Sequence, residues 1–219
     1  SLVYVTGERT ALALLLMETI LVLILLTSFR KLRLITFIIS LLIILGITFS
    51  STDIKERNIN HTINQVYLDN GLKFFSMEHQ DLFTTAKNMY TDNPIFGLGP
   101  KLFRVYCNDE LYGNKKYRCS THPHNTYLQV AAELGTVGLI FIFFVFSYVI
   151  IKLYQKIKAN IYGDEAKISD YQTCLLICFI VSLWPILPTQ SMFNNWISII
   201  YYLPVGFYLH SLYDNYSIK

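Results

Sequence analysis

Long apolar stretches restrict most strongly what this 219-residue chain can fold into. A helix needs about 20 apolar residues to cross the roughly 30 Å hydrocarbon core of a bilayer. Runs near this length lie at about 10–29, 34–50, 134–154, 172–191 and 195–213. Because 53% of the residues are hydrophobic and only 15% are charged, we expect an all-α integral membrane protein with about five transmembrane helices. The net charge of +3 is too small to imply a nucleic-acid partner.

Positive charges in two short connections predict the orientation. Three cations, Arg30, Lys31 and Arg33, follow the first run, and the connection between the third and fourth runs is crowded by Lys152, Lys156, Lys158 and Lys167. Such loops stay in the cytoplasm, which places residues 51–133 outside. The expected division is two transmembrane helices in 1–50, a helical extracytoplasmic segment at 51–133 and three transmembrane helices in 134–219. No signal peptide is expected, and the chain is expected to be a piece of a longer protein.

The four cysteines fall into two pairs with different expected states. Cys107 and Cys119 lie twelve positions apart in the polar outer segment, where an oxidising compartment would allow a disulfide. Cys174 and Cys178 lie within an apolar run and are expected to be reduced.

The outer segment contains one clear helical pattern. Apolar residues between 76 and 90 repeat every 3.6 positions, which predicts an amphipathic helix with Ser76 as its N-cap and His79 on its inward face. A second helix is expected at about 60–75. The sequence NPIFGLGP, residues 93–100, places Gly97 and Gly99 where positive φ or close approach of another backbone is permitted. It lacks the flanking elements of a nucleotide-binding fingerprint.

The sequence CSTHPHNTYLQVAAELGTVGL, residues 119–139, is the densest group of polar and small residues. Pro123 suits a first helical turn capped by Thr121 or His122, and the helix is expected to continue unbroken into the third apolar run. His124 and Asn125 would then lie in that first turn, where unpaired N–H groups attract phosphate. The same field favours a neutral His124 that can act as a base.

Several other interpretations of these residues remain open. His122 and His124 form a poor zinc signature without a third ligand. A nucleophilic cysteine or serine paired with His124 has no supporting motif. His124 can also be a capping residue without a chemical role.

NPIFGLGPKLF followed by HPHNTYLQVAAELGTVGL resembles the C-terminal half of the bacterial O-antigen ligase and O-antigen polymerase family. TGERTALALLL, residues 6–16, resembles a second landmark of that family, an arginine at the outer end of a membrane helix. The resemblance implies a GT-C-like, metal-independent, inverting glycosyltransferase of the bacterial inner membrane, without a cofactor, whose active site faces the periplasm. Its donor would be a glycan linked to undecaprenyl diphosphate, and its acceptor either lipid A core or another lipid-linked glycan.

The resemblance also implies roles for individual residues. His124 would be the general base and Arg9 would bind the diphosphate of the carrier. The family commonly has a second arginine where this chain has His79, so His79 or Arg104 would supply the missing contact. Further expected contributions are substrate binding by Lys101, orientation of His124 by Asn125, and His122 as the alternative base.

Two other classes of protein remain as alternatives. A lipid-linked oligosaccharide transporter would also have many spans and cationic sites, with broken helices near the membrane midplane. A purely structural membrane subunit would not bring histidine and arginine to one face. The sequence leaves ligase and polymerase undistinguished, because they differ in the acceptor.

Overall fold

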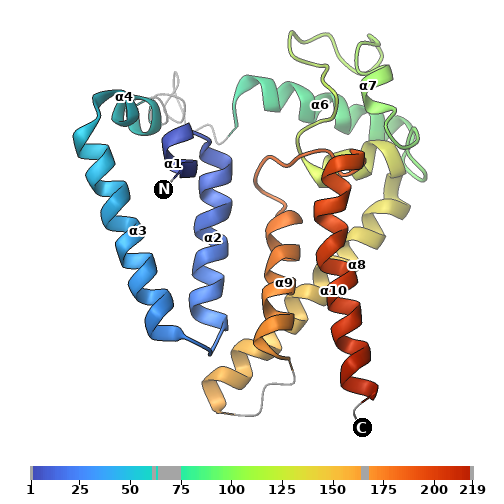
Figure 1. Cartoon of the computed structure of the whole chain (residues 1–219). Coiled ribbons are helices and arrows are strands. Elements are labelled where there is room, and N and C mark those ends of the chain that lie inside the picture. The colour runs from blue at the N-terminus through green and yellow to red at the C-terminus, as the bar shows by residue number, and fades with distance from the viewer. Residues whose placement is uncertain (1, 61–62, 64–74, 164–167, 218–219) are drawn as a thin grey trace. The chain divides into compact units, whose positions relative to one another are not determined.

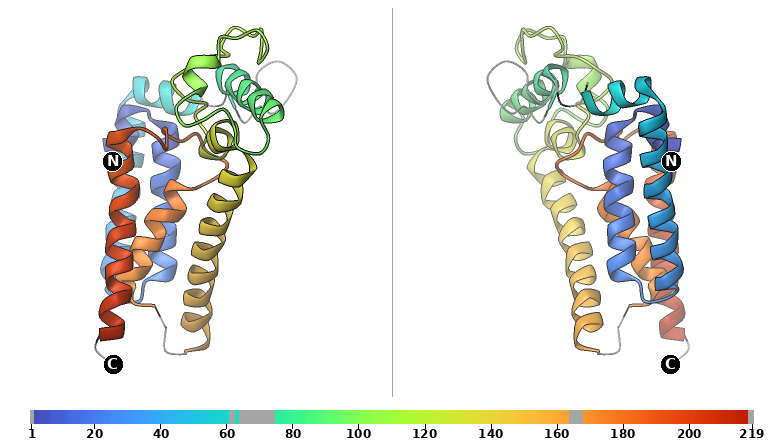
Figure 2. Two further views of the ribbon diagram at one scale, coloured as in Figure 1. Left: turned by 90° about the vertical axis from the view of Figure 1, so that its right-hand side faces the viewer. Right: turned by 90° about the vertical axis from the view of Figure 1, so that its left-hand side faces the viewer.

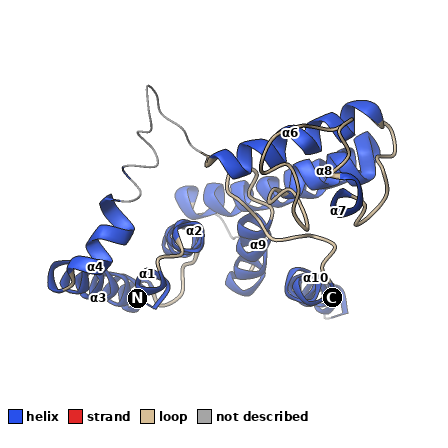
Figure 3. Ribbon diagram, turned by 90° about the horizontal axis from the view of Figure 1, so that it is seen from above, coloured by secondary structure: helices blue, strands red, loops and turns tan. Residues whose placement is uncertain are grey.

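The computed structural model describes residues 2–60, 63, 75–163 and 168–217. Every regular element in these ranges is helical, as Figure 3 shows. The prediction of an all-α chain is therefore confirmed for the described residues. The helix expected at about 60–75 falls on residues that, apart from 60, 63 and 75, lie outside the described ranges.

The chain forms two compact units, which we describe separately. The first contains residues 1–74 and 155–177, and the second contains 75–154 and 178–219. Two helices contribute residues to both units, namely α8 (Thr126–Tyr162) and α9 (Asp170–Ser182).

The first unit is built around an α-helical hairpin. Its own elements are α1 (Leu2–Thr6), α2 (Arg9–Leu25), α3 (Arg30–Ser50), α4 (Thr52–Lys55) and a π-helical turn, Glu56–Asn60. The Arg33 guanidinium donates to the carbonyl oxygens of Val22 and Leu26, at 2.7 and 2.8 Å. The Asp170 carboxylate accepts hydrogen bonds from the backbone amides of residues 27 and 28. These contacts pair polar backbone groups at the end of α2 and in its connection to α3.

Two helices of the described chain, α3 and α8, are long and apolar enough to cross a bilayer. None of the residues of α3 is buried, and most of its apolar side chains are exposed, as on a helix that contacts lipid. The 17-residue α2 and the 13-residue α9 are shorter. The helix α10 (Asn195–Ser217) is longer, but it contains Pro204 and several tyrosines that make it less apolar. Five transmembrane helices therefore remain a prediction.

The expected fourth span at 172–191 is wrong in its extent. The helix α9 ends at Ser182, and no helix follows until Asn195. Pro185 and Pro188 lie in this irregular segment, where they cannot donate the hydrogen bonds that a continuing helix needs.

The second unit contains the helix predicted at 76–90, and that prediction is confirmed. It is α6 (Met77–Asp92), and its N-cap is Ser76, whose Oγ accepts a hydrogen bond from the His79 amide. Figures 1 and 2 show α6 and α7 (Phe103–Tyr106) at the N-terminal end of α8. The buried core that joins these helices consists of Leu82, Ala86, Met89, Phe103, Cys107, Tyr112 and Ala132.

The helix α8 is broken at Gly135, where the sequence predicted an uninterrupted helix. Gly135 has φ 64° and ψ −157°. The carbonyl oxygens of Ala132 and Glu133 accept hydrogen bonds from the amides of Leu98 and Gly99, both at 2.9 Å. In return, the amides of residues 136 and 137 donate to the carbonyl oxygens of residues 94 and 95. The loop backbone thus replaces the helical hydrogen bonds that the break removes.

This exchange requires two glycines. A Cβ atom on Gly97 would lie 2.5 Å from the backbone of residues 133 and 134, and one on Gly135 would lie 2.4 Å from the carbonyl oxygen of Ile95. The expected close approach of another backbone to the glycine loop is confirmed, and its partner is the break in α8.

Gly135→Ala should destabilise the protein by about 2 kcal/mol or more, because its backbone conformation strongly favours glycine and the new methyl group would meet backbone atoms. In a chain of this size, such a loss lowers the thermal midpoint by roughly 5 °C or more. Thermal unfolding in detergent micelles measures it. Gly206→Ala is the control, because a Cβ atom there meets nothing within 4 Å. Equal midpoints for the two variants would contradict this account.

Candidate active site

The N-terminus of α8 is fixed by Asn125 rather than by Thr121 or His122. The Asn125 Oδ1 accepts hydrogen bonds from the amides of Tyr127 and Leu128, both at 3.0 Å, which is the N-cap arrangement. The helix therefore begins at Thr126, and the prediction that His124 and Asn125 form its first turn is wrong.

Asn125 also connects α8 to the irregular segment after α9. Its Nδ2 donates to the carbonyl oxygen of Pro185 at 2.9 Å. The side chain thus bonds to backbone groups on both sides, rather than to the imidazole of His124. Orientation of His124 by Asn125 therefore stays a prediction.

His124 has an unusual backbone conformation. Its φ of 55° lies in the left-handed region, which is uncommon for residues other than glycine and often marks functional sites. The amide of Thr189 donates to the His124 carbonyl oxygen at 2.9 Å. This residue, 65 positions further along the chain, holds the strained turn in place.

Three histidines come together around this turn. The ring centroid of His124 lies 4.2 Å from that of His122 and 5.7 Å from that of His79. His79 lies on α6, and its Nδ1 is 2.7 Å from Ser76 Oγ. The structure thus joins the two histidines of the HPHN sequence to a third that is more than forty positions away.

His122 is buried and both of its ring nitrogens have partners. Its Nε2 lies 3.2 Å from the carbonyl oxygen of Thr189, and its Nδ1 lies 3.0 Å from Thr121 Oγ1. A carbonyl oxygen can only accept, so Nε2 carries the proton and Nδ1 accepts from the threonine hydroxyl. Both nitrogens are engaged in the fold, which makes His122 a poor alternative base.

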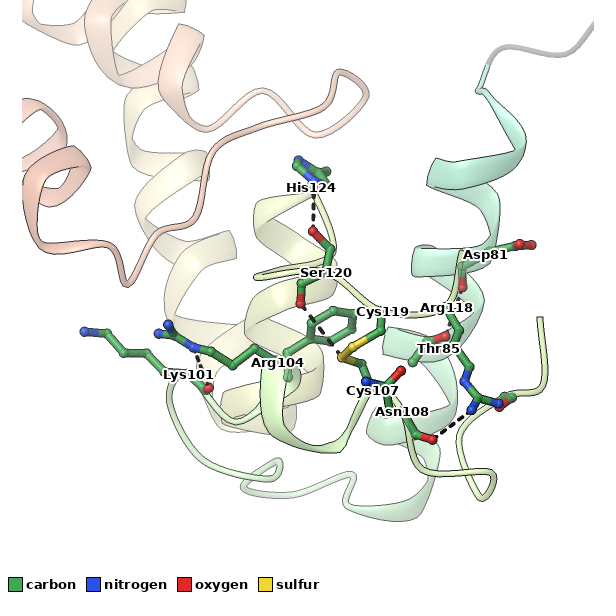
Figure 4. Close-up of a disulfide and its surroundings, with 12 residues drawn as sticks. Asp81, Thr85, Lys101, Arg104, Cys107, Asn108, Arg118, Cys119, Ser120 and His124 are labelled. Carbon is green, nitrogen blue, oxygen red and sulfur yellow. Dashed lines mark hydrogen bonds between the residues drawn. A yellow bond between two sulfur atoms is a disulfide. The ribbon is translucent and has the colours of Figure 1, made fainter. Parts of the chain in front are cut away.

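His124 is half-buried and electrostatically suited to remain neutral. Burial lowers its pKa to about 4, with smaller contributions from the neighbouring His122 and His79. The direction agrees with the expectation of a neutral ring, but the main cause is loss of solvation rather than the field of the helix end. Its Nε2 lies 3.4 Å from Ser120 Oγ (Figure 4). A neutral imidazole beside a hydroxyl can accept a proton.

A disulfide supports the loop that precedes His124. Cys107 and Cys119 are joined, with their Cα atoms 4.8 Å apart. Cys107 is fully buried in the core between α6 and α8, and its sulfur lies 3.8 Å from the carbonyl oxygen of Ser120. The bridge therefore links the hydrophobic core to the residue that contacts His124, as Figure 4 shows.

The remaining site candidates have different surroundings. Lys101 has φ 64°, and its Nζ donates to Asn195 Oδ1 at 3.1 Å. Arg104 is exposed, and its Nε donates to the carbonyl oxygen of Lys101. Arg9 begins α2 in the first unit and stays a candidate on sequence grounds. In the described part of the chain, no group of three histidine, cysteine, aspartate or glutamate residues is arranged to hold a metal ion.

Sequence reasoning missed three residues that hold the site together. Gln129 and Glu133, one turn apart on α8, are buried and joined at 3.3 Å. Glu133 also accepts a hydrogen bond from the Phe103 amide, and Gln129 accepts one from the amide of Met192. A carboxylate and an amide four positions apart beside an apolar run were a detectable signal. The sequence around Thr189, the third residue, contains no such signal.

A model of the family described as O-antigen ligase matches residues 1–143, which is more than half of the chain. No curated protein and no solved structure matches. The matched range includes Arg9, the histidine cluster and the disulfide, while Thr189 lies beyond it. The chain belongs to the O-antigen ligase family.

Proposed function

We propose that this protein transfers a glycan from undecaprenyl diphosphate to a sugar hydroxyl, with His124 as the general base. The observation that carries the proposal is the state of this side chain: a half-buried imidazole whose pKa is lowered to about 4, on a turn held in the left-handed conformation. A general base must be unprotonated at the working pH. Family membership supports a ligase or polymerase of the O-antigen type.

In the proposed reaction, His124 removes the proton from the acceptor hydroxyl as its oxygen attacks the anomeric carbon of the donor sugar. The bond from that carbon to the diphosphate oxygen breaks, and the diphosphate leaves with the electron pair. Attack from the opposite face inverts the anomeric configuration. Diphosphate needs little protonation to leave if its charge is stabilised, so neither a metal nor a separate acid is required.

Arg9 is the proposed main ligand of the donor diphosphate. A guanidinium can bind two phosphate oxygens at once, and it keeps its charge. His79 suits an accompanying role as an uncharged hydrogen-bond donor, because burial lowers its pKa. With its Nδ1 accepting from Ser76, its Nε2 carries the proton and can donate.

The proposal includes the expected membrane arrangement. Five transmembrane helices with a GT-C-like fold would place residues 51–133 in the periplasm, between the transmembrane segments 1–50 and 134–219. The exposed apolar surfaces of α3 and α8 support a bilayer location. The bacterial inner membrane follows from the lipid carrier. Lipid A core and a second lipid-linked glycan are the two candidate acceptors.

Transport of a lipid-linked glycan without catalysis is the alternative, and one observation favours it. Transporters use broken membrane helices with polar groups, and α8 has both a break at Gly135 and the buried Glu133. However, Glu133 bonds to the Phe103 amide and to Gln129. A structural role therefore accounts for this carboxylate.

His124→Ala should reduce glycan transfer by about 10²-fold or more, because a general base contributes at least that factor. Transfer from purified lipid-linked donor, measured at equal amounts of inserted protein, tests this. His122→Ala is the comparison, and its main effect should be on stability. An active His124→Ala protein together with an inactive His122→Ala protein would move the role to His122. Transport without transfer in both would favour the alternative function.

The pH dependence of transfer should follow the lowered pKa of His124. Because protonation removes the base, kcat/KM, which reports the pKa of the unliganded protein, should fall only as the pH drops towards about 4, rather than near the usual value of 6.5. Between these two pKa values the unfolded chain binds more protons at this group than the folded chain, so stability also decreases as the pH falls. Recovery of the rate after return to neutral pH separates the two effects. A reversible acid limb near 6.5 would contradict the assignment.

Arg9→Ala should weaken donor binding and lower transfer, while Arg9→Lys should retain part of the activity, because an ammonium keeps the charge but loses the two-pronged geometry. Donor affinity and transfer rate are measured for both variants. If Arg9 only anchors α2 at the headgroup level, Arg9→Ala would change stability slightly and leave both quantities intact.

A further inference from the structure

A surface depression of about 720 Å³ that is widely open to solvent, called the cavity below, lies on the loop side of the second unit. Its walls come from α7 and the disulfide loop, and the lining residues are Arg104, Asn108, Asn114, Lys115, Lys116, Arg118, Cys119, Ser120 and Thr121. This volume is within the range typical of small-molecule sites. The lining is polar, and neither of the donor-site candidates Arg9 and His79 contributes to it.

Cations predominate among the charged residues that line the cavity. Four of its nine lining residues are cations and none is acidic. Lys115 is paired with the buried Asp81 at 3.5 Å, and the Arg118 guanidinium donates to the carbonyl oxygens of Gly113 and Asn108. These two cations therefore hold the loop in shape.

Arg104 and Lys116 supply charge that is less engaged. Among the described residues, Arg104 uses only its Nε, in a hydrogen bond to a backbone carbonyl. Lys116 lies over the ring of Tyr117, with its Nζ 4.9 Å from the ring centroid. It interacts with the Tyr117 hydroxyl and with the charge of Glu78, but it forms no salt bridge with a described residue. The acids of the same loop, Asp109 and Glu110, are exposed and do not line the cavity. The cavity is thus suited to an anionic ligand with polar groups.

Ser120 connects this cavity to the proposed base. It lines the cavity, and its Oγ lies 3.4 Å from Nε2 of His124. Figure 4 shows Ser120 between His124 and the disulfide, with Arg104 nearby. A sugar held by the cations would therefore present its hydroxyls towards the residue that receives the acceptor proton.

We propose that this cavity is the subsite for an acidic sugar of the acceptor glycan, one that carries a phosphate or a carboxylate. The inference rests on the proposed function, because it is the acceptor that gives its proton to His124. In both views of Figure 2, the disulfide loop (residues 107–119) lies beyond α6, away from the long course of α8. A diphosphate attached to a membrane-embedded lipid would lie near the helix ends, whereas a glycan extends away from them. Arg104 accordingly belongs to the acceptor rather than to the donor.

Binding of a simple probe tests the cavity without any transfer. The full-length protein in detergent is titrated calorimetrically with glucose 6-phosphate, with glucose and with inorganic phosphate. We expect glucose 6-phosphate to bind more tightly than either of the others, because it offers both sugar hydroxyls and charge. The double variant Arg104→Gln/Lys116→Gln should lose about tenfold or more in affinity, as expected when charge-assisted hydrogen bonds are removed. Lys87→Gln removes an exposed α6 cation outside the cavity and should have no effect.

Transfer kinetics then identify which substrate uses the cavity. With a phosphorylated acceptor, the double variant should raise KM for the acceptor about tenfold and leave KM for the lipid-linked donor unchanged. A rise in donor KM alone would assign the cavity to the diphosphate and overturn the proposal. Unchanged binding of glucose 6-phosphate in the double variant would also overturn it. If the unaltered protein transfers no glycan, yet the double variant loses glucose 6-phosphate binding, the acidic-sugar site stands and the proposed function fails.

Discussion

The second unit depends on one exchange of backbone hydrogen bonds. Four amides and four carbonyl oxygens of residues 94–99 and 132–137 bond across the break at Gly135. A broken helix in an apolar environment would otherwise leave these groups unpaired, at a cost of several kcal/mol. Because Glu133 in the same turn accepts from the amide of Phe103, the exchange also fixes the start of α7. The position of the cationic cavity follows from it.

A second set of hydrogen bonds, from the irregular segment after α9, holds His122 and His124 in place. The irregular segment 183–194 pairs only some of its backbone groups within itself or with α9, and residues at the start of α8 pair others. Asn125 donates to the Pro185 carbonyl, while Thr189 exchanges bonds with the backbone of His124 and the ring of His122. Irregular backbone near a membrane is stable only when protein or water pairs it. The same contacts that stabilise this segment therefore impose the left-handed turn at His124.

Local patterns in the sequence predicted the structural features that depend on residues close together in the chain. The 3.6-residue period of apolar residues and the Ser76 N-cap predicted α6, and Gly97 indicated the close approach of another backbone segment. The start of α8 was misplaced because Thr121, His122 and Asn125 all suit an N-cap, and the choice depends on the distant Pro185. Long-range contacts also decided how the residues of the site come together. No pattern around residue 79 predicts that α6 packs so that its histidine faces His124.

The two polar regions of the second unit differ in charge, and the proposed chemistry uses both. Around His124, burial and neighbouring imidazoles disfavour positive charge. A few residues earlier, α7 and the disulfide loop together carry four cations around a cavity. A base that works at neutral pH must stay unprotonated, and strong fixed charge beside it would hinder the transient imidazolium that forms on proton transfer. An anionic ligand in the cavity would reduce this penalty, because it neutralises the cations nearest to Ser120. Occupation of the cavity would thus favour proton uptake by His124 when an acceptor is present.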